Sequence, residues 1–372
     1  MLSSSGFFPL RVCQALWEKA EPRDYPRTVG AADVIQSLLI AFVARLSGLR
    51  AIVARCHQRL HTASIASLCE ALRRPSSLRF CELLVRSLQT LHRPRPMELV
   101  ALDSMAVTLP ATQRHRCAKF NDKTAGGGVL WAYMVEAARG VCPVQVLRVV
   151  DGAWHDSRLM RGVALASCGP VYLMDRGFYA LDLLEHWLEK RVHFIVRAKR
   201  RSLVWEDLVI CGAKRRAGDV RIVHDALVRL GGPRAKAHPV VRLVIARLAN
   251  GDELIVVSSL WDWTAEALLA AYKKRGRIEG FHRLLKESVG LAHLYSFHRV
   301  GLRLLAHAAL LVALLLFIGS AHGGGDTCAA LHAALAAVRA ALGLGPAWKR
   351  NTLAPRRAKK RPKGRRARGH NP

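Results

Sequence analysis

The stretch Pro170–Lys199, "PVYLMDRGFYALDLLEHWLEKRVHFIVRAK", contains two apolar runs separated by an amphipathic segment. Short apolar runs such as "VYLM" and "HFIV", bounded by turn residues, are typical of buried strands. The segment between them, "ALDLLEHWLEK", has the apolar spacing of a helix. A strand, a helix and a second strand in this order indicate an α/β sheet.

The segments before this stretch extend the predicted sheet. Three of them are strand candidates, and a fourth reads as a helix that precedes Pro170. The strands are "ELVALDSMAVTL" (98–109), "GGGVLWAYMVEA" (126–137) and "VCPVQVLRVVDG" (141–152), and the helix is "HDSRLMRGVALA" (155–166). Three strands followed by alternating helices and strands predict an α/β sheet of mixed direction.

The rest of the chain divides by composition. Residues 28–92 have helical spacing and end at the breaker "HRPRP". Strand-like runs return between residues 200 and 259, and helical periodicity resumes at Thr264. The predicted domains are a helical N-terminal domain (1–95), the first part of the core (96–199), a β-rich insertion (200–259), the second part of the core (260–345) and a basic tail (346–372).

The formal net charge of +31 favours a polyanionic partner. Nucleic acid is the first candidate, with an anionic membrane surface and ribosomal RNA as alternatives. The segment 349–372 contains eleven Lys or Arg residues and no acid, and we expect it to be disordered when free.

The cysteines, the N-terminus and one apolar run bear on the cellular compartment of the protein. The nine cysteines include no CxxC pair, which indicates reduced thiols in a cytosolic protein and no zinc site. The N-terminus lacks the pattern of a signal peptide. The apolar run 304–319 has 16 residues, below the roughly 18–20 that a membrane span needs, so it predicts a buried core helix. A cytoplasmic protein without a membrane segment is expected.

The run "YKKRGRIEGFHRLLK" (272–286) contains a single acid, Glu279, in a strongly basic helix. On a helical wheel, Tyr272, Arg275, Glu279 and Lys286 fall within roughly 60° of one another. A solvated basic face with an Arg275–Glu279 pair, four residues apart, explains this pattern without any function.

Two further acids favour a functional interpretation. Asp103 interrupts the apolar run "LVALDSMAV", and Asp175 ends "PVYLMD". A carboxylate in a buried strand is costly unless it is paired or bound to a metal. The alternatives are a capping role or an arginine partner. Three acids on two strands and a helix suit divalent cations with oxygen ligands, which can activate a nucleophile at a phosphodiester.

Several other residues have both a structural and a functional interpretation. Capping preference favours Asp156 as a helix N-cap over a place near the site. Lys119 precedes a glycine run and is a candidate DNA contact or a solvated loop residue. Arg197 and Lys199 follow "HFIV" and are candidate phosphate contacts or solvated surface residues.

Together, "ALDSMAV", "LMDRGFYALDLLEHWLEKRVHFIVRAK" and "YKKRGRIEGFHRLLK" resemble the DDE transposases of bacterial insertion sequences. The third acid of this family lies in a Y-(2)-R-(3)-E-(6)-K signature, and Tyr272, Arg275, Glu279 and Lys286 match that spacing. The resemblance extends from about residue 99 to residue 294.

The resemblance implies an RNase H-like core, with helices flanking a mixed sheet, that is interrupted by the β-rich insertion. It implies Asp103, Asp175 and Glu279 as ligands of Mg²⁺, with two ions and with Mn²⁺ as a substitute. It also implies cleavage at transposon ends, transfer of the freed 3′-hydroxyl to target DNA, and a dimer assembled on the DNA ends in the bacterial nucleoid. The alternatives are a decayed transposase that only binds DNA, a nuclease without strand transfer, and a membrane protein.

Overall fold

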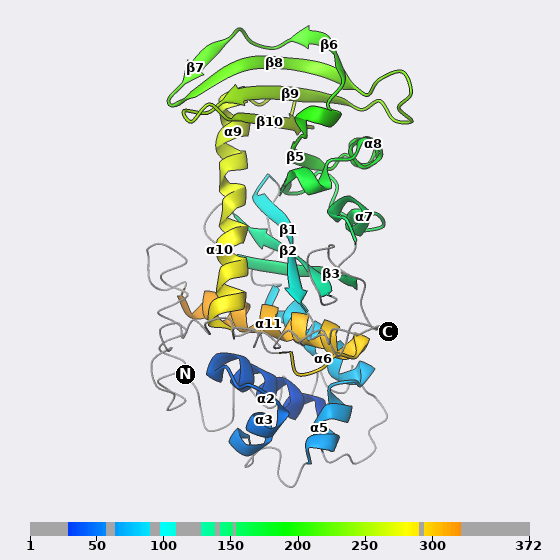
Figure 1. The fold of residues 1–372 in the computed structure, drawn as a ribbon, viewed down its shortest axis with the longest axis vertical. Helices are drawn as coiled ribbons and strands as arrows, with labels where there is room; N and C mark the ends of the chain where they lie inside the picture. The colour runs from blue at the N-terminus through cyan, green and yellow to red at the C-terminus, as the bar shows by residue number, and fades with distance from the viewer. Residues whose placement is uncertain are drawn as a thin grey trace, which may run out of the picture.

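The computed structural model describes residues 29–56, 64–89, 97–108, 128–137, 142–151, 154–289 and 294–320. One mixed sheet runs through most of this length, in the strand order β3-β2-β1-β4-β5-β10-β9-β8-β6, with β7 paired to β8. In Figure 1 the strands β6–β10 lie at one end of the molecule and the helices α2, α3 and α5 at the other.

The central part of the sheet comes from the segments that the sequence predicted as strands. An antiparallel meander is formed by β1 (Leu99–Thr108), β2 (Gly128–Glu136) and β3 (Cys142–Asp151). Two parallel strands follow on the other side of β1, namely β4 (Val171–Met174) and β5 (His193–Arg197). The mixed α/β fold is therefore confirmed, and it is consistent with an RNase H-like core.

Two short helices cover one face of this sheet. The first, α7 (Asp156–Met160), is shorter than the predicted helix 155–166, since Arg161 turns to extended backbone and Gly162 has a φ of 75°. The second, α8 (Leu181–Glu189), packs Trp187 and Leu184 against the strands. Figure 1 shows both helices on the side of the sheet opposite α9 and α10.

The basic run quoted above is helical but not one ideal α-helix. It begins at the end of α9 (Ala265–Lys273), continues through the 3-10 turn η4 (Lys274–Gly276) and α10 (Arg277–Arg283), and ends inside the π-helical segment η5 (Leu284–Ser288). The changes of helix type alter the turn per residue, so the uniform wheel of the sequence argument is only approximate. One side of this segment packs into the core, since Ile278, Phe281 and Leu285 are all buried.

The strands between β5 and α9 continue the same sheet. They are β6 (Trp205–Ile210), β7 (Arg215–Ala217), β8 (Val220–Leu230), β9 (Val240–Arg247) and β10 (Glu253–Ser258). The strand β10 is antiparallel to β5, which joins these strands to the central sheet through main-chain hydrogen bonds.

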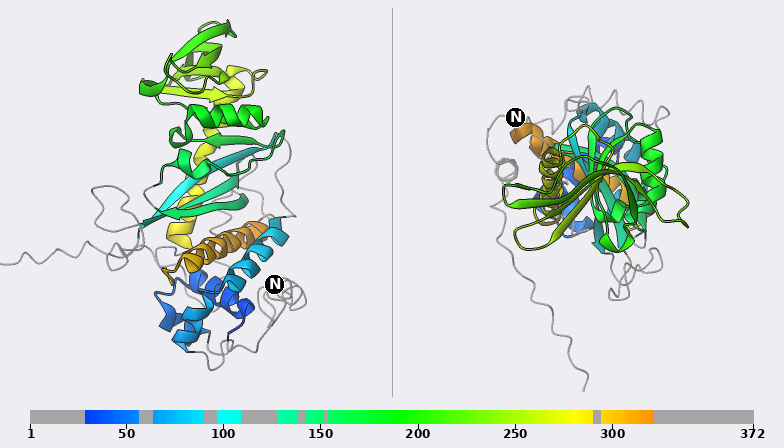
Figure 2. Two further views of the ribbon diagram at one scale, coloured as in Figure 1. Left: turned by 90° about the vertical axis from the view of Figure 1, so that its right-hand side faces the viewer. Right: turned by 90° about the horizontal axis from the view of Figure 1, so that it is seen from above.

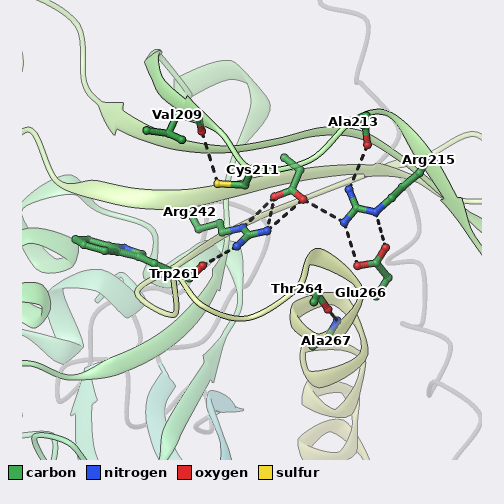
Figure 3. A network of polar contacts seen from close by, with 10 residues as sticks. Val209, Cys211, Ala213, Arg215, Arg242, Trp261, Thr264, Glu266 and Ala267 are labelled. Atoms are coloured by element: carbon green, nitrogen blue, oxygen red, sulfur yellow. Dashed lines mark hydrogen bonds and ion pairs between the residues drawn. The ribbon is translucent and has the colours of Figure 1, made fainter.

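A network of charged side chains ties these strands to the start of α9 (Figure 3). Asp225 on β8 accepts hydrogen bonds from Arg242 on β9 and from Arg215 on β7. Arg215 also donates two hydrogen bonds to Glu266, at 2.6 and 3.0 Å, in the first turn of α9. Because α9 leads directly to η4 and α10, this network fixes the helix that carries Glu279 relative to the outer strands.

The long apolar helix α11 (Arg299–Ser320) crosses beneath the sheet (Figure 2). It packs on β3 and on two of the N-terminal helices, α2 (Ala31–Ala44) and α6 (Pro75–Gln89). Two shorter helices, α3 (Leu49–Arg55) and α5 (Ile65–Ala71), complete that layer.

The sequence argument underestimated the length of α11. Its stretch Arg299–Phe317 is long and apolar enough to cross a membrane. The helix is nevertheless 72% buried inside the protein over that window, as a core helix is. Burial, and not length, therefore supports the prediction of a core helix.

Candidate active site

The register of two parallel strands places Asp103 beside Asp175. Leu102 on β1 pairs with Met174, the last residue of β4, and each of these two residues is followed by an aspartate. Parallel strands in register present equivalent residues on the same face of the sheet. The middle of β1 and the residue that follows β4 thus supply two neighbouring acids.

The guanidinium of Arg275, in η4, contacts all three predicted acids. Its Nη2 lies 2.7 Å from Oδ2 of Asp103 and 3.9 Å from Oδ2 of Asp175. Its Nη1 donates a hydrogen bond of 2.6 Å to Oε1 of Glu279. The two aspartate oxygens therefore lie close to each other, because both contact the same nitrogen, Nη2. Glu279 binds the other terminal nitrogen, Nη1, of the same guanidinium.

The three acids differ in exposure. The side chain of Asp103 is 16% exposed, that of Asp175 is 33% exposed and that of Glu279 is 64% exposed. Burial raises the pKa of Asp103 to about 6, although the Arg275 guanidinium and the Ser104 amide act in the opposite direction. Asp175 accepts a hydrogen bond from the amide of Arg176, which caps the turn η2 (Arg176–Phe178). The predicted capping role of Asp175 is thus present together with its contact to Arg275.

A buried polar cluster lies behind Asp103. Nδ1 of His282 is 3.9 Å from Oδ2 of Asp103, and burial lowers the pKa of His282 to about 3, with Lys286 and Arg275 acting in the same direction. Burial also raises the pKa of Tyr272 to about 12. Within the described residues, Nε of Arg275 and Nε2 of His282 are buried without a hydrogen-bond partner. Buried polar atoms without a hydrogen-bond partner lower the stability of a fold, so this cluster favours binding of a further ligand.

The predicted basic residues have different positions. Arg197 and Lys199 line an open pocket of about 580 Å³, together with Arg200, Arg201 and Arg176, the residue that follows Asp175. Lys286 is exposed in η5, close enough to His282 to affect its pKa. Lys119 lies outside the described residues, as do the N-terminal 28 residues and the tail 346–372.

Sequence reasoning gave Asp156 the wrong structural role. The N-cap of α7 is His155, and Asp156 is the first residue of the helix. Its Oδ1 accepts a hydrogen bond of 2.6 Å from the hydroxyl of Ser104, the neighbour of Asp103 on β1. Ser104 gave no signal of its own in the sequence. The stretch "WHDSRL" (154–159) did indicate Asp156 as a residue near the site, but capping preference favoured the N-cap interpretation.

The donor atoms of the site suit a divalent cation. Three carboxylates around one positive charge are the hard oxygen ligands that Mg²⁺ and Mn²⁺ prefer. Within the described residues, no group of three or more His, Cys, Asp or Glu side chains is gathered closely enough to hold a metal ion. The guanidinium of Arg275 occupies the space between the acids. The three carboxylates are therefore suitable metal ligands by their chemistry, but in this structure their side chains are arranged around the arginine.

Comparison with known proteins shows the family of the chain. The family described as the transposase DDE domain matches residues 94–315, which is more than half of the chain. A protein of Geobacillus stearothermophilus named as a probable transposase for insertion sequence element IS5377 is 24% identical over 291 residues, which are 76% of this chain and 74% of that protein. A protein of Sinorhizobium fredii named "Putative transposase y4zB" is 27% identical over 185 residues, which are 48% of this chain and 50% of that protein. The chain therefore belongs to the DDE transposase family.

Proposed function

We propose that this transposase cleaves the ends of an insertion element with divalent metal ions held by Asp103, Asp175 and Glu279, and then joins the freed 3′-hydroxyl to target DNA. The observation that carries the proposal is the shared guanidinium, since acids from β1, the end of β4 and α10 all contact Arg275. Residues that are distant in the sequence converge on one positive charge.

Two Mg²⁺ ions are the proposed cofactors, and Mn²⁺ can substitute for them. When bound, two such ions would supply activation of an attacking oxygen and stabilisation of a leaving oxygen at a phosphodiester. Asp103, Asp175 and Glu279 would hold them, after the guanidinium of Arg275 leaves the space between the acids.

The proposed DNA contacts are Tyr272, Arg275, Lys286, Arg197, Lys199 and Lys119. Two of them line the basic pocket described above, whose five Lys and Arg residues face one acid, Glu253. Phosphate groups neutralise such a surface and release counterions from DNA. A strand held in this pocket would pass Arg176, the residue that follows Asp175.

The remaining parts of the proposal concern organisation. The helical segment 1–95 is proposed to bind the transposon ends, and the basic tail 346–372 to add sequence-independent affinity. The strands of 200–259 are proposed as an insertion between the two parts of the core, 96–199 and 260–345. We also propose a dimer on the paired DNA ends, in the bacterial cytoplasm at the nucleoid.

The test is nicking of a labelled terminal fragment in Mg²⁺ or Mn²⁺. Asp103→Ala, Asp175→Ala and Glu279→Ala should each lower nicking by more than the roughly 10 to 100-fold that is typical of outer-shell residues. Binding to the same fragment should persist, because affinity comes from the cationic surface. Nicking by any of the three at the wild-type rate would remove that residue from the site.

The same assay separates the alternatives. A nuclease without strand transfer would nick the terminal fragment but would not join it to a target plasmid. A decayed transposase would bind the fragment without nicking it in either metal. Joined products that depend on all three acids would support the full proposal.

A further inference from the structure

Asp156 connects the two strands that carry the catalytic aspartates. Ser104 donates its backbone N–H to Oδ1 of Asp103 at 2.9 Å, and it donates its hydroxyl to Oδ1 of Asp156 at 2.6 Å. One serine therefore binds a carboxylate through its main chain and a second carboxylate through its side chain. The alternation of side chains along β1 puts Asp103 and Ser104 on opposite faces of the sheet.

The second contact of Asp156 is with the turn that follows Asp175. A methyl group added to Gly177 would overlap Oδ2 of Asp156. The carboxylate thus packs directly against the backbone of η2, two residues after Asp175. Only glycine allows this close approach, because any side chain at position 177 would displace the carboxylate.

These contacts occur where the two strands separate. The pairing of β1 with β4 ends at Leu102 and Met174, and β1 continues while the chain after Met174 turns into η2. Asp156 lies between the continuing strand, at Ser104, and the turn, at Gly177. The helix α7 is itself fixed by Leu159 and Met160, which are buried in the core on the face of the sheet that α8 also covers.

We propose that Asp156 is a positioning residue for the metal site, which sets the spacing of Asp103 and Asp175 by accepting the Ser104 hydroxyl and supporting the turn at Gly177. This inference rests on the proposed function, since Asp103 and Asp175 are the ligands it positions. Asp156 is not itself placed as a ligand. A hydrogen-bonded partner of this kind orients a ligand and changes metal affinity without touching the ion.

The charge of Asp156 has a separate consequence. Its carboxylate adds a negative charge close to Asp103, to which it is linked through Ser104. A nearby negative charge strengthens the attraction of a cation to Asp103. This effect depends on the charge of Asp156, whereas the positioning role depends on its acceptor oxygen, so Asp156→Asn separates the two.

The experiment measures Mn²⁺ binding to the full-length protein without DNA, by titration calorimetry. Asp156→Ala should weaken Mn²⁺ binding by about 10 to 100-fold. Asp156→Asn, which retains the acceptor oxygen, should recover most of that loss. Gly177→Ala should weaken binding with Asp156 intact, because the new methyl group displaces its carboxylate.

The matched control is Asp182→Ala, which removes an exposed acid of α8 whose partner is Arg161. It should bind Mn²⁺ as the wild type does. Wild-type affinity in folded Asp156→Ala would overturn the inference, and so would an Asp156→Asn protein as weak as Asp156→Ala. If Asp156→Ala does not fold, Ser104→Ala removes the same hydrogen bond from a smaller residue, and the same outcomes apply.

One further variant keeps the two proposals apart. Asp103→Asn should abolish Mn²⁺ binding at this site if the proposed function is right. Wild-type Mn²⁺ binding by Asp103→Asn would reject the metal site as a whole. Loss of binding in Asp103→Asn together with wild-type binding in Asp156→Ala would reject only the positioning role.

Discussion

Asp225 accepts two hydrogen bonds from Arg242, at 2.9 and 3.2 Å, and its side chain is completely buried. The same carboxylate also binds Arg215, which continues to Glu266 at the start of α9 (Figure 3). The position of the helix that carries Glu279 thus depends on a buried acid in a distant strand. The first two predictions follow from this network.

Removal of Asp225 should be strongly destabilising. Asp225→Ala leaves Arg242 buried without its carboxylate, which typically costs about 3–5 kcal/mol. Urea denaturation measures the loss. Asp207→Ala is the control, because Asp207 is 40% exposed and binds His224 at the surface. A loss below about 1 kcal/mol for Asp225→Ala would mean that the network does not hold the sheet together.

Glu266 should contribute stability that disappears in acid. Hydrogen bonding from Arg215 lowers the pKa of Glu266 from 4.5 to about 2. A carboxyl group with a lowered folded pKa stabilises the protein above its unfolded pKa, and this stabilisation is lost as the pH falls towards the folded value. The stability difference between wild type and Glu266→Gln should be full above about pH 4.5 and shrink towards pH 2.

The expected difference at neutral pH is about 0.2–1 kcal/mol, because the side chain of Glu266 is 40% exposed and solvent screens the pair. Urea denaturation at a series of pH values measures it. Glu189→Gln is a control that removes the same charge from an exposed position on α8. A difference that stays constant from neutral pH down to pH 2 would contradict the role of the Arg215 hydrogen bond.

Arg275 should act as the internal counterion of the site. Arg275→Ala should lower the Tm without metal by several degrees, since Asp103, Asp175 and Glu279 lose their common partner. Added Mn²⁺ should then raise the Tm of Arg275→Ala more than that of the wild type, because the metal replaces the missing charge. Thermal unfolding with and without Mn²⁺ measures both effects.

The control for this prediction is Arg283→Ala, an exposed arginine on the same helical run. Its response to Mn²⁺ should match that of the wild type. Equal Mn²⁺ responses in wild type and Arg275→Ala would show that the guanidinium does not compete with the metal.

Lys286 should matter more for nicking than Lys273, although both are exposed. Lys286→Ala should keep Mn²⁺ binding but lower nicking of the terminal fragment, because a phosphate contact next to the scissile bond is lost. Lys286→Arg should recover part of the activity, since the charge is kept while the geometry changes. Equal nicking by Lys286→Ala and Lys273→Ala would show that Lys286 has no special role and that both residues only add to a generally basic surface.

The tail should contribute salt-dependent affinity. Deletion of residues 349–372, which contain eleven Lys or Arg, should weaken binding to random DNA. The slope of log K against log salt should flatten by roughly 0.9 for each lost phosphate contact. An unchanged slope would show that the tail does not contact DNA.

The sequence by itself determined the elements and the family. Apolar periodicity predicted β1, β4, β5 and the helix α8, because burial of an apolar face requires that spacing in any fold. An acid inside an apolar strand was visible at Asp103 without a structure, since such a residue needs a partner. The spacing of Tyr272, Arg275, Glu279 and Lys286 carried the resemblance to DDE transposases, which the family comparison confirms.

Only the tertiary structure decided which side chains meet. The contact between Arg275 and Asp103 spans 172 positions, and it depends on how α9 and α10 lie across β1. The link from Asp156 through Ser104 depends on where β1 and β4 separate, which periodicity does not encode. Local preferences also misassigned Asp156 as a cap, because the energy of a cap is comparable to that of one hydrogen bond from a neighbouring strand. Register and helix placement arise from packing over the whole core, so contacts between distant residues follow from the fold and not from any single stretch of sequence.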